Sequence, residues 1–363
     1  MKITVLQENL KVGLARVNRA ISTRPQLPIL ANVLIEAKQG KLFLRGTDLE
    51  LGIKVEVGAK VEEEGKVTVP AKMFLEFVSS IPAGKVEMET KDGGVRVVSG
   101  RYKADFQAME ADEYPEFPVI DKQGEGVVVF QNKELNQALH KVVYAAAKDS
   151  MRPILTGILI EGKVKKWRVV ATDGFRLALN EGAGGGKEFK VVVPHRAVME
   201  VLKLESEEVG FRLLEETNQV VFWSEGVEVV SQVLEGSYPD YERIIPKEFK
   251  LRLVVGRESL LEGVMVAQVF ARDNSNILKW KVEGDGLRIV SESPEQGKNE
   301  TFVEAEVEGH SIEIAFNGKF LLDFLQSSKA EEIEIGLGDS LAPGSFKEVG
   351  NKDFLYIVMP INL

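Results

Sequence analysis

The sequence contains no cysteine and only three histidines among its 363 residues. Without cysteine there are no disulfides, no catalytic thiolate and no cysteine-bound zinc, as suits a reducing cytoplasm. None of the histidines, His140, His195 and His310, has a serine, a second histidine or a carboxylate at a spacing typical of a catalytic triad or a metal site. We therefore expect no catalytic residues, no bound metal and no cofactor.

Long hydrophobic runs are also absent. No stretch of about 18 apolar residues occurs, as a membrane-spanning helix would require. The segment from Met1 to Leu10 carries charges where a signal peptide has its apolar core. With 44% hydrophobic and 28% charged residues, the composition is typical of a soluble globular protein. We expect a cytoplasmic protein with no membrane contact.

What the sequence does contain is a long internal repeat. Four apolar residues, spaced as on one face of a helix, occur three times: Leu10, Leu14, Val17, Ile21; then Leu135, Leu139, Val142, Ala146; then Leu260, Val264, Ala267, Ala271. Solenoid repeats span only about 20–50 residues, so this longer period indicates three homologous domains. We predict domains over residues 1-120, 121-247 and 248-363.

Each copy combines two helical segments with several strand segments. The six predicted helices are Glu8–Ala20, Ala71–Ile81, Lys133–Lys148, His195–Lys203, Arg257–Arg272 and Gly318–Lys329. Between them lie alternating or continuous β-branched runs, which are typical of strands. We expect an α+β protein in which each domain packs two helices on antiparallel sheet.

The net charge of −10 is unevenly distributed. The predicted helices carry net positive charge, so the acidic excess belongs to strands, loops and linkers. One helical position is basic in all three copies, at Lys72, Arg196 and Lys319, with an acidic residue four positions later in each. The local interpretation is an ion pair on a solvated helix face. The recurrence also fits a basic surface that holds nucleic-acid phosphates without reading bases, while the acidic remainder repels DNA.

Asp48 and Asp173 are the best candidates for an acid pair, because they occupy matching positions in two copies. Each follows a predicted strand and precedes a turn, where aspartate commonly binds its own backbone. We favour that turn interpretation. Two alternatives remain: an enzyme or carbohydrate-binding protein that uses these carboxylates, and a peptide-binding scaffold that never contacts DNA.

Several segments resemble one family. They are Thr172 to Ala178, Ser237 to Tyr241 with Arg243 to Pro246, Tyr356 to Pro360, and Arg24-Pro25 followed by Leu27 to Leu30. Together they look like the bacterial sliding clamps, the β subunits of DNA polymerase III, and the resemblance spans the whole chain. It implies the DNA-clamp fold, with helices lining a ring of two chains and antiparallel sheets outside. The ring encircles duplex DNA, tethers the replicative polymerase and confers processivity without catalysis.

The resemblance also implies how the ring closes and what it docks. The first domain of one chain would contact the third domain of the other, with sheet edges pairing across the boundary. Implied partners are double-stranded DNA of any sequence, a second copy of the chain, the replicative polymerase, the clamp loader, other DNA polymerases, ligase and mismatch-repair proteins. The protein partners would dock through short peptides.

The implied peptide cleft comprises Leu155, Thr172, Gly174, Phe175, Arg176, Leu177, Pro239, Arg243, Ile244, Ile357, Met359 and Pro360. Its apolar members suit anchor side chains of a peptide, and its arginines suit polar groups. The alternative is that these are core residues at a domain junction. Phe175 stands where many relatives have histidine, and Asn362 stands where arginine is usual, so partner preference stays open.

Two further sets of residues follow from the resemblance and the repeat. The expected DNA-facing residues are Arg24, Lys72, Lys141, Lys148, Arg152, Arg196 and Lys319. For the subunit contact we expect Phe106 as an apolar anchor, and Arg96 and Lys103 as ion-pair partners of Glu295 and Glu300.

Overall fold

The computed structural model describes residues 1–91, 93–149, 151–184 and 186–362. The α-helices are α1 Gln7–Val17, α2 Ala71–Ser80, α3 Asn132–Val142, α4 His195–Val201, α5 Arg257–Ala271 and α6 Gly318–Ser327. All six predicted helices are therefore confirmed. Each ends one to six residues earlier than predicted, and α1 and α3 pass into 3-10 turns at Asn18–Ala20 and Val143–Ala145.

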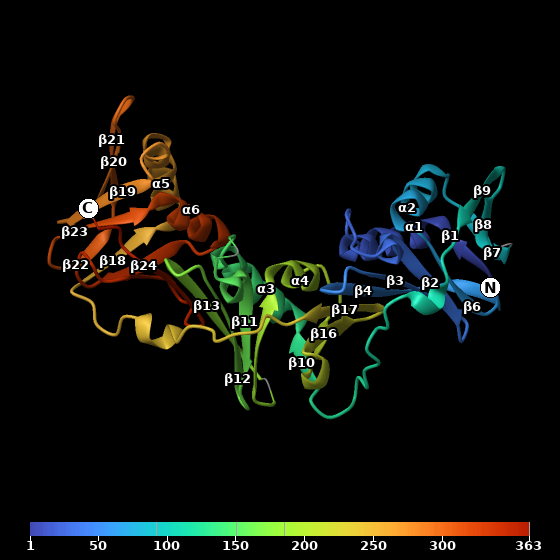
Figure 1. Ribbon diagram of the computed structural model, residues 1–363. Helices are drawn as coiled ribbons and strands as arrows, with labels where there is room; N and C mark the ends of the chain where they lie inside the picture. Colours follow the sequence, from blue (N-terminus) through green and yellow to red (C-terminus); the bar gives the residue numbers. More distant parts are fainter. Residues whose placement is uncertain (92, 150, 185, 363) are drawn as a thin grey trace. The chain divides into compact units, whose positions relative to one another are not determined.

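The chain divides into two compact units (Figure 1). One unit combines residues 1–132 with 199–233, and the other combines residues 133–198 with the chain from 234 onward. No helix among the described residues is long and apolar enough to cross a membrane.

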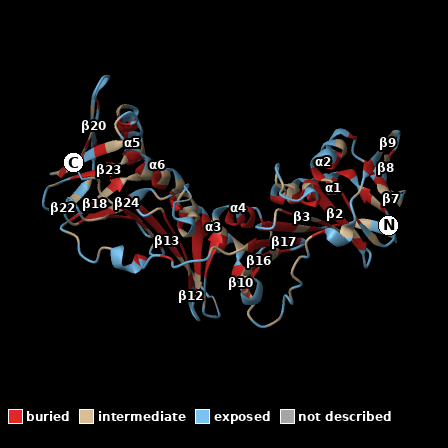
Figure 2. Cartoon of the chain, viewed as in Figure 1, coloured by how far each residue is buried: buried red, intermediate tan, exposed pale blue. Residues whose placement is uncertain are grey.

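The first unit contains two antiparallel sheets, with strand orders β5-β1-β7-β8-β9 and β10-β15-β16-β17-β4-β3-β2-β6. The strands are β1 Lys2–Leu6, β2 Asn32–Lys38, β3 Lys41–Thr47, β4 Leu51–Val57, β5 Ala59–Glu63, β6 Gly65–Pro70, β7 Lys85–Lys91, β8 Gly94–Ser99, β9 Tyr102–Gln107, β10 Val128–Gln131, β15 Glu208–Leu214, β16 Gln219–Ser224 and β17 Val227–Gln232. Helix α1 packs on β3, β4 and α2. The predicted apolar residues of α1, including Leu10, Leu14 and Val17, are buried there. Figure 2 shows that α1 carries buried and exposed residues.

The second unit contains sheets of order β14-β11-β12-β13-β26-β25-β24-β18-β22 and β21-β20-β19-β23. The strands are β11 Gly157–Gly162, β12 Lys166–Thr172, β13 Arg176–Ala183, β14 Phe189–Pro194, β18 Leu251–Gly256, β19 Ile277–Glu283, β20 Gly286–Ser293, β21 Gly297–Glu304, β22 Glu306–Gly309, β23 Ile312–Asn317, β24 Glu332–Leu337, β25 Gly344–Glu348 and β26 Phe354–Val358. Helix α5 packs on β20, β21 and α6. A buried aromatic cluster that includes Trp280, Phe316 and Phe346 lies in the same unit.

The sequence repeat is also a repeat of strand order. Each copy contains two four-stranded groups with the same strand order. The first group is β6-β2-β3-β4, β14-β11-β12-β13 and β23-β19-β20-β21 in the three copies, and the second group is β9-β8-β7-β1, β17-β16-β15-β10 and β26-β25-β24-β18. Strand β4 pairs with β17, and β13 pairs with β26. Each of these joints unites strands from consecutive copies in one sheet. The compact units therefore cut across the repeats, a consequence of sheet pairing that the sequence did not predict.

Candidate functional site

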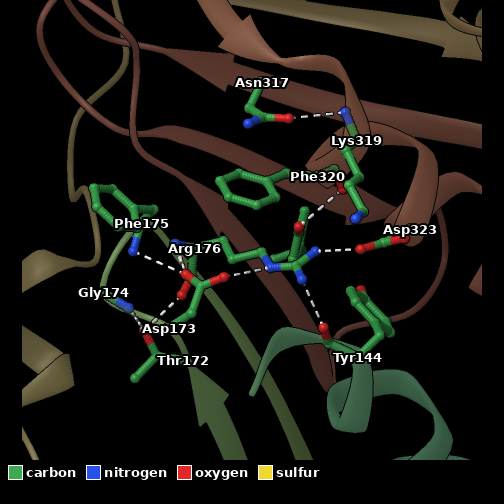
Figure 3. Close-up of polar contacts among 11 residues, drawn as sticks. Tyr144, Thr172, Asp173, Gly174, Phe175, Arg176, Asn317, Lys319, Phe320 and Asp323 are labelled. Carbon is green, nitrogen blue, oxygen red and sulfur yellow. Dashed lines mark hydrogen bonds and ion pairs between the residues drawn. The ribbon is translucent and has the colours of Figure 1, made fainter. Parts of the chain in front are cut away.

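The turn that precedes β13 is held by its own side chains (Figure 3). The Oδ1 of Asp173 accepts hydrogen bonds from the amides of Phe175 (2.9 Å) and Arg176 (3.0 Å), and the Oγ1 of Thr172 accepts one from the amide of Gly174 (3.0 Å). Gly174 has a φ of +92°, which a residue with a side chain rarely adopts. The turn is thus preformed, and it leaves the ring of Phe175 65% exposed.

Arg176 is buried beneath this turn and is only 4% exposed. Its Nε donates to Asp173 Oδ2 (2.9 Å), its Nη1 to Asp323 Oδ2 of α6 (2.6 Å), and its Nη2 to the carbonyl of Tyr144 (2.7 Å). The guanidinium also stacks over the ring of Phe320, 4.4 Å from its centroid (Figure 3). Arg176 therefore fastens the turn to α6, and little of its charge is presented to solvent.

The strands β13 and β26 bring the next predicted cleft residues together. Leu177 is paired with Ile357, and the amide of Met359 donates to the carbonyl of Phe175 (2.8 Å). Leu177, Ile357 and Leu155 belong to one buried cluster. Their side chains are therefore core, as the junction alternative holds, whereas Met359 and the neighbouring Pro360 stay partly exposed.

The linker after β17 lies over this cluster. The hydroxyl of Tyr238 donates to the carbonyl of Val170 (3.3 Å), and that of Tyr241 to Glu161 Oε2 (2.7 Å). Burial raises the pKa of both phenols above the usual value, so they stay neutral donors. These two hydrogen bonds hold the linker in place. The predicted cleft residues that it carries, Pro239, Arg243 and Ile244, are exposed.

The recurrent basic residues occupy one structural position. Lys72, Arg196 and Lys319 are each the second residue of a helix, in α2, α4 and α6, and each is exposed. Of the acidic residues four positions later, Glu200 pairs with Arg19 (2.6 Å), and Asp323 pairs with Arg176.

The other expected DNA-facing residues differ in exposure. Arg24, Lys148 and Arg152 are exposed in non-helical segments. Lys141 on α3 is half-buried, with its Nζ 2.5 Å from Oε2 of the buried Glu348 and over the ring of Phe354. Lys141 therefore already has a carboxylate partner.

Three of the expected subunit-contact residues, Lys103, Phe106 and Glu300, lie on the edge strands β9 and β21, whereas Arg96 lies on β8 and Glu295 in the turn before β21. Among the described strands, β9 pairs only with β8, and β21 only with β20. Lys103 on β9 and Glu295 before β21 are exposed, Arg96 pairs with Asp105, and Glu300 on β21 pairs with Arg288. Phe106 is 6% exposed, because it packs edge-to-face on Phe74 and Phe77. Its use as a subunit anchor stays a prediction.

The aspartates that repeat in the sequence are turn residues. Asp48 Oδ1 accepts hydrogen bonds from the amides of Glu50 (3.1 Å) and Leu51 (2.9 Å), as Asp173 does from the amides that follow it. The turn interpretation is confirmed. In the described part of the chain, no group of three or more His, Asp or Glu side chains is placed to hold a metal ion.

Sequence reasoning missed the residues that support the turn. Tyr144, Phe320 and Asp323 reach Arg176 from two other segments. Asp323 had been noted only as a helical partner of Lys319, and no local pattern connects any of the three to residue 176.

Comparison with known proteins covers the whole chain. Family models match residues 1–118 (DNA polymerase III beta subunit, N-terminal domain), 129–240 (central domain) and 242–362 (C-terminal domain). The beta sliding clamp of Synechococcus elongatus is 31% identical over all of both chains. A crystal structure of the DNA polymerase III beta subunit of Thermotoga maritima is 32% identical, with a TM-score of 0.91 over 100% of this chain and 99% of that one. A sliding clamp of Pseudomonas aeruginosa bound to griselimycin is 28% identical, with a TM-score of 0.94 over the full length of both. This protein therefore has the three-domain clamp fold and belongs to the DNA polymerase III beta subunit family, the sliding clamps of DNA replication.

Proposed function

We propose that two copies of this chain close head to tail into a ring that encircles duplex DNA, tethers the replicative polymerase and confers processivity. The observation that carries this proposal is the pair of internal sheet joints, β4 with β17 and β13 with β26. In each joint, the last strand of one four-stranded group pairs with a strand of the following copy. The same rule assigns β21 of the third copy to β9 of a first copy, which only another chain supplies in a closed ring.

The repeat also suggests the register of this third joint. In strands β4, β13 and β21, the residues Gly52, Leu177 and Lys298 occupy matching positions. Each pairs with the corresponding residue of the strand before it, which is Thr47, Thr172 and Glu292 respectively. In the strands that they would pair with, β17 and β9, Val227 and Tyr102 occupy matching positions. Val227 pairs with Ser224 across the β16–β17 hairpin, and Tyr102 pairs with Ser99 across the β8–β9 hairpin. Since Val227 faces Val55 in the first joint, Tyr102 would face Thr301 in the third.

Charges agree with this register. It places Lys103 opposite Glu300 and Asp105 opposite Lys298, so both cross-strand pairs are attractive. A slip of two residues places Lys103 opposite Lys298, or Asp105 opposite Glu300. The matching position of the first joint also carries an ion pair, Lys54 with Glu228 at 3.2 Å.

We assign the DNA contact to exposed basic residues, three of them on helices. Lys72, Arg196 and Lys319 repeat at one structural position with exposed side chains, and Arg24, Lys148 and Arg152 add exposed positive charge. Contacts of this kind attract phosphates without reading sequence, which lets a ring slide. Lys141 is a weaker contributor, because Glu348 already neutralises it.

The partner cleft we assign to the surface around Phe175 and Met359. The two residues are joined by a backbone hydrogen bond and lie above the buried apolar cluster. The linker contributes Tyr241 to that cluster and exposes Pro239, Arg243 and Ile244, which are close to Tyr241 in sequence. An apolar surface with a flexible thioether suits the anchor side chains of short peptides. We propose that the polymerase, the clamp loader, other polymerases, ligase and mismatch-repair proteins dock here.

The remaining parts of the proposal follow from the family. The protein is a non-enzymatic, cytoplasmic factor with domain boundaries at residues 1-120, 121-247 and 248-363. The deciding experiment loads the protein with a clamp loader on closed circular DNA at physiological salt and then linearises the DNA. A ring is retained on the circle and slides off the line, whereas equal retention excludes topological linkage. Native mass checks the assembly, since the chain is 40.2 kDa and a dimer is about twice that mass.

A further inference from the structure

The pairing of strands β13 and β26 extends beyond the proposed cleft. We consider here the face of this pair that the linker after β17 covers. Phe175 faces Met359, and Leu177 faces Ile357, and these two rungs belong to the proposed cleft. The same face continues with Leu179 opposite Leu355, and then with Glu181, whose amide donates to the carbonyl of Asp353. Successive rungs are about 7 Å apart. A peptide chain a few residues long thus reaches from the cleft to the second pair of rungs.

A hollow of about 420 Å³ opens over these further rungs. Leu179, Leu355 and Ile245 give it an apolar floor, which is continuous with the buried cluster under the cleft. Lys247 from the linker, Lys347 from β25 and Lys352 from the turn before β26 stand around it. We call this feature the lysine groove.

The charges of the lysine groove are unbalanced. Glu181 is bound by Arg168 and Lys166, and Glu242 is bound by Arg168, so two cations balance these two carboxylates. Lys247, Lys347 and Lys352 are exposed, and none has an ion-pair partner among the described residues. Asp353 is the one carboxylate of the lining without an ion pair in the part of the chain that the structure describes.

We propose that the lysine groove holds an acidic flank of the peptide that docks in the proposed cleft. The inference rests on the cleft proposal and extends it from an apolar anchor site to a two-part site. Apolar side chains of the flank lie on Leu179 and Leu355, and its carboxylates face the three lysines. The occupant follows from charge complementarity and from the shared strand ladder.

The probes are two blocked pentapeptides, one alternating aspartate with leucine and one alternating serine with leucine. Calorimetry at low salt compares the chain with the variant Lys247→Ser, Lys347→Ser, Lys352→Ser. We expect the aspartate peptide to bind the unaltered chain about three- to tenfold more tightly, as two or three partly exposed ion pairs allow. The variant loses that difference and keeps its affinity for the serine peptide.

A matched variant, Lys163→Ser, Lys165→Ser, Lys279→Ser, removes three exposed lysines elsewhere in the same unit and should change nothing. Equal affinity of the two peptides for the unaltered chain overturns the proposal, and so does an equal loss in both variants. Retention on circular DNA distinguishes failure of the groove proposal from failure of the ring proposal. An unaltered chain that is retained on circular DNA but binds the two peptides equally contradicts the groove proposal and leaves the ring proposal standing.

Discussion

The Nη1 of Arg176 lies 2.6 Å from the Oδ2 of Asp323, and this contact joins the turn before β13 to helix α6. Burial alone would lower the pKa of Arg176, but Tyr356 and the carboxylates of Asp323 and Asp173 raise it above the usual value. The side chain is therefore a permanent cation. It connects Phe175, in the proposed cleft, with the helix that carries Lys319.

Arg176→Gln should destabilise the second unit. The substitution leaves Asp323 and Asp173 without their cation in a partly buried site, which we expect to cost about 2–4 kcal/mol in the free energy of unfolding. Arg243→Gln is the control, because Arg243 pairs with Asp240 at the surface and should cost less than about 1 kcal/mol. Urea unfolding of both variants measures the difference. Equal costs would mean that Arg176 does not hold the turn.

Phe175→Ala combined with Met359→Ala should weaken binding of a polymerase-derived docking peptide. Loss of two apolar contacts of this size costs about 1–2 kcal/mol each. Calorimetry should show a tenfold or larger loss of affinity, with unchanged native mass. Leu177→Ala is a poorer test, because Leu177 is buried and its truncation costs about 2–5 kcal/mol of stability. Unchanged peptide affinity in the double variant would place the cleft elsewhere.

Lys103→Glu and Glu300→Lys should each weaken dimerisation, because each places like charges opposite one another in both joints of the ring. Mixing the two variants should restore a dimer, since each mixed joint again opposes unlike charges. Sedimentation of the single variants and of the mixture measures this. Expected losses for the single variants are about tenfold or more in the dissociation constant. A mixture no tighter than its components would refute the proposed register.

Lys72→Glu, Arg196→Glu and Lys319→Glu together should shorten residence on circular DNA and reduce its salt dependence, because fewer phosphates are neutralised. Circular dichroism checks that the helices remain. Lys163→Glu, Lys165→Glu and Lys279→Glu make the same charge change on sheet strands and loops. Residence that falls equally in both variants would reflect net charge alone.

Glu348 should make stability depend on acid pH. Burial alone would raise its pKa, but hydrogen bonds from Lys141, Asn351 and Ser328 hold the pKa below its usual range. A carboxyl whose pKa is lower in the folded state stabilises the fold fully above its unfolded pKa of about 4.3, and this contribution is lost as the pH falls through the folded value. Unfolding free energies measured from pH 7 to 3 should fall less steeply for Glu348→Gln. Identical slopes would contradict this assignment.

Much of the local structure follows from neighbouring residues. The apolar spacing of Leu10, Leu14 and Val17 predicted α1, and the position of Asp173 predicted its turn. Helices and turns form from contacts within a few residues, so adjacent side chains carry the signal. The same holds for the matching positions of Lys72, Arg196 and Lys319.

By itself, the sequence determined the repeat, the six helices, the capped turns and the family. Only the tertiary structure decided that β4 pairs with β17 and that β13 pairs with β26. It also decided that the buried Arg176 forms an ion pair with Asp323, and that Leu155, Leu177 and Ile357 are core residues. Strand partners and buried ion pairs join residues far apart in the chain. Their choice depends on how whole sheets pack, which no local spacing encodes.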